Sequence, residues 1–298
     1  MNCQTFFTTW IARRVALEQI SAATAEGYAC TLAPFFVAHR TRNIASLSAS
    51  DIEDFYIARL KVVASATLRG SHVLLKQLFN EARKKGLVAV NPLDDVDAPK
   101  AAAAGEKKAL DCAQIRALLA YAADKPLLLR TVKLAIATGL RRGELAGLLW
   151  SCIDFDAGVI RVTRNIVKVS KTEIVSTPKS AAGVRQIALP ADLLAELRKA
   201  RGAPDAPVLR TQQGGRPSLA YLSEMLTSAL RAIGCGDGFT LHSTRHTHAT
   251  HLLRAGGSVK AVSVRLGHAD TTVTMRTYAK VLNGDDADLA RAIGNVLG

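Results

Sequence analysis

The sequence predicts a mostly α-helical protein with a small β-sheet, in which an all-helical N-terminal domain precedes a mixed α+β C-terminal domain. Apolar residues recur at helical spacing through most of the chain. The stretches of β-branched residues that predict strands lie within positions 159–189. A segment of small and charged residues, 98–108, has no large apolar side chain and is typical of a linker. We therefore expect domains at residues 1–97 and 109–298.

Length and composition exclude several classes of protein. The 298 residues suit one large or two ordinary domains, and an apolar fraction of 49% is too high for a disordered polycation. No run approaches about 18 uninterrupted apolar residues, and the N-terminus lacks the basic-then-apolar order of a signal peptide. The five cysteines are scattered and include no C-x-x-C pair, which argues against a disulfide scaffold or a cysteine-built zinc site. We therefore expect a cytoplasmic protein without a membrane span.

The net charge is strongly positive, with 39 Lys and Arg against 25 Asp and Glu, a formal +14. Residues 1–100 hold 12 basic and 9 acidic residues, whereas residues 101–298 hold 27 and 16. An excess of this size favours a nucleic-acid partner, because phosphates that bind basic side chains release their counterions. A merely basic enzyme has the same composition, so the charge alone does not separate the two interpretations.

The first domain is expected to contain four or five short helices. Ser50 and Glu53 have the spacing of a capping box at a helix start. Lys84-Lys85-Gly86 gives a basic last turn followed by the glycine that commonly ends a helix, and Asn91-Pro92 prevents the helix from continuing. The apolar helix faces are formed by Phe6, Phe7, Trp10 and Ile11, by Ile52, Phe55, Tyr56 and Leu60, and by Leu74, Leu75, Leu78 and Phe79.

The second domain is expected to mix helices with strands. Asp111 and Gln114 form another capping box, which starts a helix, and residues 127–137 also have helical spacing. Strands are expected at 159–167, at 184–189 and, more weakly, at 172–176. Further helices are expected at 192–201, 219–233, 245–255, 259–266 and 285–297.

Two arginines follow a glycine at the end of an apolar helix, in the segment Ala137-Thr-Gly-Leu-Arg-Arg-Gly-Glu-Leu145. Arg141 and Arg142 stand where a new helix would begin, with Glu144 inside it. A guanidinium presents a planar fork that can grip two phosphate oxygens at once. An arginine pair at a helix start is also typical of an ordinary solvated helix end, so this segment alone leaves both interpretations open.

A histidine-rich segment runs from Leu241 to Leu253. His242 and Arg245 are three residues apart and share one face of a helix. His242 and His246 have the spacing of zinc-binding helices, but the acidic residue of H-E-x-x-H is missing. We therefore favour His242 and Arg245 as a phosphate-facing pair over a metal site, with His246 and His251 as packing or capping groups.

Three further residues are candidates for chemistry. His268 lies at the turn Leu266-Gly-His-Ala-Asp270, where a histidine is more often a capping or solvent-facing residue. Tyr278 lies on a helix, where tyrosine usually joins the core, and as a nucleophile its phenol, with a pKa of about 10, needs help to lose its proton. Lys179 lies in a polar turn between strands, where it is either an ordinary exposed lysine or a residue that reaches into a groove of DNA.

These segments together resemble the tyrosine recombinases, also called phage integrases. The order carries the resemblance: T-G-L-R-x-x-E-L, a lysine on a hairpin, H-x-x-R-H-T-x-A-T, L-G-H and then a tyrosine. The resemblance covers essentially the whole chain and is most specific over residues 137–145 and 241–280. It implies a helical core-binding domain that clamps DNA at residues 1–97, followed by a catalytic domain of the tyrosine recombinase type at residues 109–298.

The resemblance implies that the protein cleaves and rejoins DNA through a 3′-phosphotyrosyl intermediate. Tyr278 corresponds to the nucleophile, and Arg141 and Arg245 correspond to the residues that hold the scissile phosphate. Lys179 corresponds to the general acid toward the 5′-oxygen that leaves. His242 corresponds to the general base or to a residue that positions the tyrosine.

His268 is implied to complete the phosphate pocket, and Glu144 is implied to support it from outside. Two arginines and two ring N–H groups can stabilise a phosphoryl-transfer transition state without a metal. The chain lacks an acidic cluster suited to two metal ions, and it lacks the G-x-x-x-x-G-K-[ST] motif. A tyrosyl ester stores the energy of the broken phosphodiester, so we expect no cofactor, no metal and no ATP requirement.

The expected partner is double-stranded DNA, bound by a homo-tetramer that is a monomer or dimer without DNA. Candidate DNA contacts are Lys76, Arg83, Lys84, Lys85 and Arg142, although an exposed helix face predicts the same pattern of basic residues. A helix at 285–298, with an apolar face, is expected either to dock on a neighbouring subunit or to pack on its own domain.

Integration or excision of a mobile element or prophage is the favoured role, because the stretch 160–189 resembles integrase hairpins more than the short Xer form. Xer-like resolution of chromosome dimers is the alternative. A type IB topoisomerase shares the pocket chemistry, but the chain length and the helical first domain argue against it. The complete set of candidate residues argues against a non-catalytic DNA-binding regulator. No extra N-terminal arm-binding domain is evident.

Overall fold

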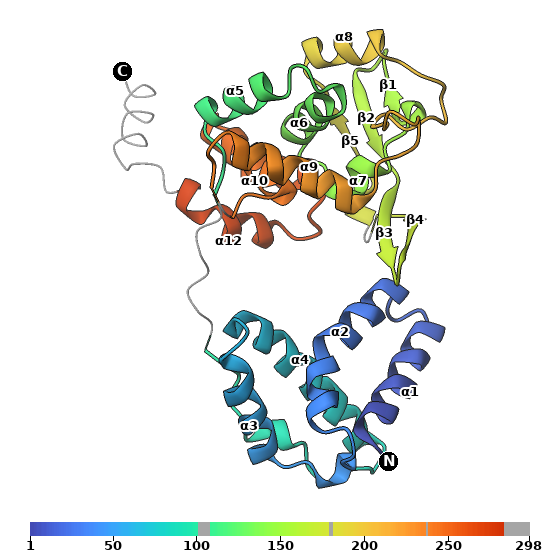
Figure 1. Cartoon of the computed structure of the whole chain (residues 1–298), viewed down its shortest axis with the longest axis vertical. Coiled ribbons are helices and arrows are strands. Elements are labelled where there is room, and N and C mark those ends of the chain that lie inside the picture. Colours follow the sequence, from blue (N-terminus) through green and yellow to red (C-terminus); the bar gives the residue numbers. More distant parts are fainter. Residues whose placement is uncertain (101–107, 179–180, 237, 283–298) are drawn as a thin grey trace, which may run out of the picture. The chain divides into compact units, whose positions relative to one another are not determined.

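Helices form most of the protein in a computed structural model, which describes residues 1–100, 108–178, 181–236 and 238–282 (Figure 1). The chain divides into two units, Met1–Glu106 with Lys168–Thr172, and Lys107–Val167 with Glu173–Gly298. Within the described ranges, no helix is long and apolar enough to cross a membrane.

Apart from the short segment Lys168–Thr172, where β3 (Asn165–Val169) ends and β4 (Thr172–Ser176) begins, the described part of the first unit consists of helices and loops. Its α-helices are α1 (Cys3–Ala16), α2 (Ala22–Ala38), α3 (Ala49–Leu60) and α4 (Ser65–Lys84), with 3₁₀ turns at Ile44–Ser46 and Pro92–Asp94. The predicted apolar faces meet in one core, in which Phe35, Leu75 and Phe79 are completely buried. Leu60 is the exception, since it is exposed and lies outside this core. Aromatic rings pack edge to face within it, as in the pair Phe35 and Phe55, whose centroids are 5.2 Å apart. The helical character of this unit is thus as predicted.

The ends of two helices in this unit test the predicted caps. Helix α4 ends at Lys84, and Gly86 adopts a left-handed φ of +69°, as the basic last turn and the glycine predicted. The predicted capping box of Ser50 and Glu53 is wrong. Helix α3 begins two residues earlier, with Ser48 and Asp51 as the reciprocal pair. Both pairs have the same spacing, but Asp51 also forms an ion pair with Arg42 from outside the helix, which favours the earlier start.

The second unit contains eight described α-helices and five described strands. The helices are α5 (Cys112–Tyr121), α6 (Pro126–Thr138), α7 (Arg142–Ala146), α8 (Ala191–Lys199), α9 (Leu219–Ala232), α10 (Leu241–Arg254), α11 (Val259–Leu266) and α12 (Thr271–Leu282). The strands are β1 (Ile153–Asp154), β2 (Val159–Val162), β3 (Asn165–Val169), β4 (Thr172–Ser176) and β5 (Arg185–Ala188). Short 3₁₀ turns occupy Trp150–Cys152 and Ala181–Gly183.

The strands form two small sheets rather than one. Strands β1, β2 and β5 pair antiparallel in that order, with Ile160 opposite both Ile153 and Ile187. Strands β3 and β4 form a separate pair. The single strand predicted at 159–167 is therefore wrong, because the chain leaves the first sheet after Val162. Its next strand passes so close to α7 that a Cβ on Gly143 would overlap the Asn165 Oδ1 atom.

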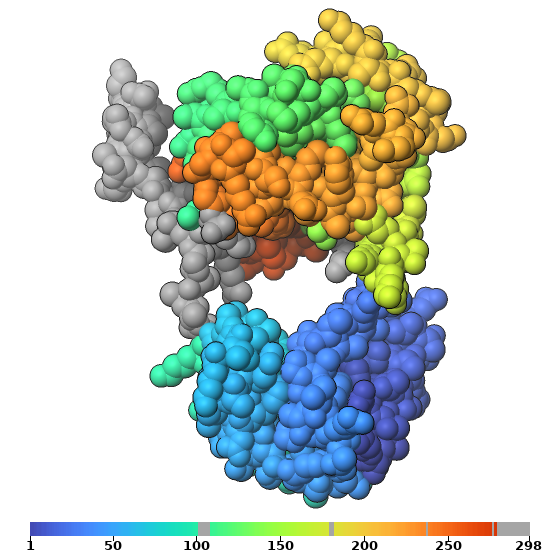
Figure 2. Space-filling view, viewed as in Figure 1, coloured from blue at the N-terminus to red at the C-terminus, as the bar shows by residue number. Residues whose placement is uncertain are grey.

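Helix α6 lies at the centre of the second unit and packs against α10 (Figure 1). In the space-filling view, α5 and α6 (green) adjoin α9 and α10 (orange) on one continuous surface (Figure 2). Helix α10 begins at Leu241, one turn before the predicted start at residue 245, because Thr240 caps it by accepting from the His242 backbone N–H. The predicted helix at 285–298 lies outside the described residues.

Candidate active site

Two left-handed glycines end the helices that lead into the site. Gly139 ends α6 with φ +64°, and a Cβ there would lie 2.7 Å from the His248 ring. Gly267 ends α11 with φ +68°, and a Cβ there would lie 2.8 Å from the Ala182 carbonyl oxygen. Both positions therefore require glycine for backbone conformation and for space. The carbonyls beside these two turns converge on the arginines of the site.

Glu144 lies at the centre of the site and is 2% exposed. Four N–H groups donate to its carboxylate: the backbone N–H and Nη1 of Arg141, both at 2.8 Å, and Nη1 and Nη2 of Arg185, at 3.1 and 2.9 Å. Burial alone would raise the pKa of Glu144, but the hydrogen bonds and charges of Arg185 and Arg141 hold the pKa below its usual range. Glu144 is therefore an ionised anchor for two guanidinium groups.

Arg141 and Arg245 approach the same stretch of backbone from different helices. Arg245 is 3% exposed and donates to the Gly139 carbonyl at 2.7 Å and to the Leu266 carbonyl at 2.6 Å. Arg141 is the N-cap residue of α7 and donates to the carbonyl of Gly267, the residue after Leu266, at 3.0 Å. Burial and the charge of Arg141 lower the pKa of Arg245 to about 9, so it remains charged at neutral pH.

His268 follows these carbonyls directly. Its Nδ1 atom is hydrogen-bonded to the hydroxyl of the buried Thr274 at 2.8 Å. Burial and the charges of Arg245 and Arg141 lower the pKa of His268 to about 4. The ring is therefore neutral at pH 7, and its charge would repel the arginines if it were protonated.

Tyr278 lies in α12 and is 4% exposed. Its ring stacks on that of His246, with centroids 4.8 Å apart, and packs in a small apolar cluster with Leu253 and Leu266. Burial raises the pKa of the phenol to about 12, although the charge of Arg245 opposes the rise. The backbone of Tyr278 is not helical (φ −118°, ψ 17°), so it interrupts the helix in which it lies.

His242 is exposed in the first turn of α10, and its charge is among those that lower the pKa of His268. The structure therefore brings together Arg141, Glu144, His242, Arg245, His268 and Tyr278. Lys179 lies outside the described residues. Within the described part of the chain, no group of three His, Cys, Asp or Glu side chains is arranged to hold a metal ion.

Sequence reasoning missed Arg185, which is the second partner of Glu144. It is 8% exposed and lies at the start of β5, on the same face as the buried Ile187. That alternation was the available signal, because it points residue 185 inward, but arginine is rarely buried without a partner and the partner is distant in sequence. His248 was also missed: its ring bonds the Ile136 carbonyl at 2.7 Å and accepts from Arg265 Nε at 3.1 Å.

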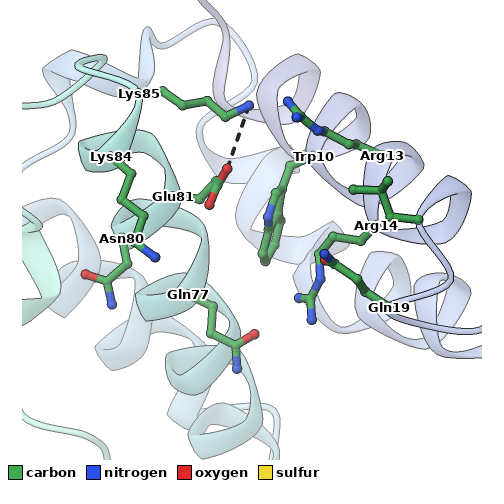
Figure 3. A pocket seen from close by; sticks show the side chains of 10 residues that line it. Trp10, Arg13, Arg14, Gln19, Gln77, Asn80, Glu81, Lys84 and Lys85 are labelled. Atoms are coloured by element: carbon green, nitrogen blue, oxygen red, sulfur yellow. Dashed lines mark ion pairs between the residues drawn. The ribbon is translucent and has the colours of Figure 1, made fainter.

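The basic residues predicted to contact DNA fall into separate environments. In the first unit, Lys76 and Arg83 both pair with Asp94, at 3.3 and 3.4 Å. Lys84 and Lys85 line a groove of about 690 Å³ between α1 and α4 (Figure 3). In the second unit, Arg142 is exposed and donates to Ser223 at 2.9 Å.

The groove between α1 and α4 carries more cations than acids. Arg13 and Arg14 on α1 face Lys84 and Lys85 on α4, and Glu81 is the one acid in its lining, paired with Lys85 at 3.7 Å (Figure 3). Three amide side chains and two apolar residues complete the lining: Gln19, Gln77 and Asn80 supply the amides, and Trp10 and Leu17 are apolar. The groove is therefore an exposed cationic surface with polar side chains between the charges.

The groups that meet in the second unit are suited to binding an anion. Two guanidinium groups and a neutral imidazole converge at the turn after α11, and a phenol lies close to one of the guanidinium groups. Such groups can stabilise charge that develops on non-bridging oxygens during transfer of a phosphoryl group.

Sequence comparison with known proteins gives a family match over most of the second unit. Residues 108–284 match the sequence model of the Phage integrase family. The chain is 32% identical over 198 residues to tyrosine recombinase XerC of Xylella fastidiosa (strain M23), an alignment that covers 64% of this chain and 62% of the relative. The chain thus spans less than two thirds of the length of that relative.

Solved structures share the fold. The Tn1549 transposon integrase in complex with a circular intermediate DNA superposes with a TM-score of 0.81, at 21% identity, over 100% of both chains. The lambda integrase tetramer bound to a Holliday junction superposes with a TM-score of 0.70, at 19% identity, over 91% of this chain and 79% of the other. At these identities the likeness concerns the fold.

Proposed function

Since the chain belongs to the phage integrase family, we propose that it is a site-specific DNA recombinase that cleaves and rejoins DNA through a 3′-phosphotyrosyl intermediate. The observation that carries the proposal is the convergence of Arg141, Arg245 and His268 around one turn of backbone beside Tyr278. A catalytic tyrosine recombinase needs a phosphate pocket next to a phenol, and these residues supply both.

The cleavage step balances without a cofactor. The Tyr278 oxygen attacks the scissile phosphorus, a bond forms between them, and the bond from phosphorus to the 5′-oxygen breaks. His242 accepts the phenol proton, and Lys179 donates a proton to the 5′-oxygen that leaves. Rejoining is the reverse reaction, in which a 5′-hydroxyl attacks the phosphotyrosine and frees Tyr278.

The arginines act by electrostatics and position. Arg141 and Arg245 hold the non-bridging oxygens, and His268 donates a hydrogen bond to the same phosphate. Fixed donors are effective here because they need no reorganisation as charge develops. Glu144 supports the pocket by fixing Arg141, as its two hydrogen bonds from that residue at 2.8 Å indicate.

Integration or excision of a mobile element is the proposed role, supported by the likeness to the Tn1549 transposon integrase over the whole chain. Xer-like resolution of chromosome dimers is the second candidate, favoured by the name of the relative that is 32% identical. We propose a homo-tetramer on two DNA duplexes, by analogy with the lambda integrase tetramer on a Holliday junction. A cytoplasmic location is proposed with it, and all five cysteines are unpaired.

We propose that the domain at 109–298 carries out the phosphate chemistry and that the domain at 1–97 clamps the DNA, with 98–108 as the linker. Lys84 and Lys85 would contact the duplex from the groove between α1 and α4, together with Arg13 and Arg14. Lys76 and Arg83 would contribute less, because each already pairs with Asp94. Arg142 is proposed as a contact beside the pocket.

The test first selects DNA that the protein binds from a pool of duplexes with a randomised centre. The selected duplexes are then nicked, so that cleavage releases a short strand and cannot be reversed. Incubation in EDTA is expected to give a protein–DNA complex that survives detergent. The absence of a complex on selected DNA would favour a non-catalytic regulator. Relaxation of plasmids that lack the selected sequence would favour a topoisomerase, and sequencing the trapped DNA would separate element ends from a chromosomal dimer site.

A further inference from the structure

Arg185 is a buried arginine that has no role in the cleavage steps proposed above. Its side chain is 4% exposed, and its guanidinium donates to three separate segments. Two N–H groups go to the Glu144 carboxylate, at 3.1 and 2.9 Å. The others reach the Gly183 carbonyl at 3.0 Å and the Arg265 carbonyl at 2.7 Å.

Each of these segments adjoins a residue of the proposed active site. Glu144 bonds Arg141 through both its backbone and its side chain. Gly183 ends the short 3₁₀ turn that follows Lys179 in the sequence. Arg265 lies three residues before His268, at the end of α11. One guanidinium therefore ties together the parts of the chain that carry the pocket.

Stability alone is a weak reason for such an arrangement. A buried ion pair adds little net stability, because the loss of hydration of both charges offsets their attraction. What the fork of Arg185 gives is geometry: two parallel N–H bonds fix the plane of the Glu144 carboxylate. With its plane fixed, the Glu144 carboxylate can bind Arg141 in only one orientation.

We propose that Arg185 is a positioning residue for phosphoryl transfer, which fixes Glu144 so that Glu144 holds the Arg141 guanidinium at the scissile phosphate. This inference rests on the proposed function. It separates the pocket into a layer that touches DNA, Arg141 and Arg245, and a buried layer that does not, Glu144 and Arg185. The buried layer affects the rate of cleavage and leaves DNA affinity unchanged.

The first test is Arg185→Lys, which keeps the charge and removes the fork. Single-turnover cleavage of the nicked, binding-selected duplex is expected to slow about 10- to 100-fold, because small misplacements of a catalytic group cost rate on that scale. The DNA Kd is expected to stay within about 3-fold, since Arg185 does not reach solvent. Arg198→Lys is the control at an exposed arginine, because Arg198 also donates to a backbone carbonyl, that of Phe155, at 2.5 Å. It is expected to cleave at the wild-type rate.

A modified substrate identifies the route by which Arg185 acts. When sulfur replaces the 5′-bridging oxygen, the leaving group needs no proton, so a defect in a general acid disappears. The Arg185→Lys defect is expected to persist on this substrate, as a defect in phosphate binding by Arg141 does. Full recovery of the rate would overturn the proposal, because Arg185 would then act on Lys179 through the Gly183 turn. Lys179→Ala serves as the reference that recovers.

The double variant Arg185→Met with Glu144→Gln keeps the test decisive if single variants unfold, since it removes both buried charges together. Its rate is expected to equal that of Glu144→Gln alone, because Arg185 has nothing left to position. Multiplied defects would overturn the proposal. Wild-type protein that forms no covalent complex would refute the proposed function. A wild-type complex, with Arg185→Lys equally fast and folded by its thermal unfolding midpoint, would refute this inference alone.

Discussion

The phosphate pocket and the nucleophile are held in place by different forces. Arg245 and Arg141 are fixed by hydrogen bonds to carbonyls and to a buried carboxylate. Tyr278 is held by apolar packing and by the stacked ring of His246, in a helix that its own backbone interrupts. Hydrogen bonds to charged groups define orientation, whereas apolar packing is not directional. The pocket is therefore preorganised by directional bonds, and the tyrosine is packed beside it.

The pKa shifts in the pocket and at the nucleophile also differ. Burial and neighbouring cations lower the pKa of His268 to about 4, and burial raises the pKa of Tyr278 to about 12. A bound phosphate would bring negative charge to a pocket that holds excess positive charge. Bound DNA thus relieves repulsion in the pocket, while the phenol still requires a base.

The largest effect is expected when the nucleophile is removed and the pocket is kept. Tyr278→Phe removes the attacking oxygen and keeps the ring that stacks on His246. We expect covalent complex to fall below detection on the nicked duplex, with the DNA Kd and the thermal midpoint unchanged. Undiminished complex with this variant would assign the nucleophile to another residue.

The next effect compares the two arginines. Arg141→Ala and Arg245→Ala are each expected to slow cleavage about 10²- to 10³-fold, as loss of a preorganised donor does. Arg245→Ala should also lower the free energy of unfolding by about 1–3 kcal/mol, because it leaves the buried carbonyls of Gly139 and Leu266 without a donor. Arg141 is 40% exposed, so its loss should change stability much less. Chemical unfolding of both variants measures the difference, and equal destabilisation would contradict it.

A feature of the fold or of the site could be predicted from the sequence where it depends on residues that are neighbours in the sequence. The ends of α11 and α4, and the arginine at the start of α7, follow from Gly267, Gly86 and the T-G-L-R segment, because a cap is set by its neighbours in sequence. The burial of Arg185 depends on Glu144, 41 residues away, so the alternation that points residue 185 inward does not by itself predict a buried arginine.

The errors have the same origin. The start of α3 at Ser48 depends on Arg42, which the spacing of the helix does not reveal. The break between β2 and β3 depends on the close approach of Asn165 to α7. The candidate residues themselves could be named from their order, but the stacking of Tyr278 on His246 could not, because it requires the packing of α12 on α10.

A smaller effect concerns pH and the buried imidazoles. The folded-state pKa of His248 is lowered to about 4 by burial, against about 6.5 in an unfolded chain. The unfolded state therefore binds more protons between these values, so stability is full above pH 6.5 and falls as the pH drops toward 4, by about 2–3 kcal/mol. Urea unfolding at pH 7.0, 5.5 and 4.5 measures the slope. His248→Gln should reduce the slope without abolishing it, because the pKa of His268 is also lowered to about 4. An unchanged slope in this variant would contradict the assignment.

The smallest effect lies outside both regions, in the groove between α1 and α4. Lys84→Gln is expected to weaken DNA binding a few-fold and to reduce the slope of log affinity against log salt by about 1, without changing the cleavage rate of bound DNA. Lys125→Gln is the control, because Lys125 is exposed in the second unit and already pairs with Asp124 at 2.8 Å. Equal salt slopes for the two variants would remove the groove from the DNA-binding surface.

The central claim is that Tyr278 becomes covalently attached to DNA in a pocket built by Arg141 and Arg245. The direct measurement is trypsin digestion of the trapped complex followed by mass spectrometry of the peptide that retains nucleotide. Cleavage after Arg276 and Lys280 releases Thr277-Tyr-Ala-Lys280. The account predicts a 3′-phosphorylated nucleotide on the tyrosine of this peptide. Nucleotide on any other peptide, or a complex that forms with no modified tyrosine, would contradict it.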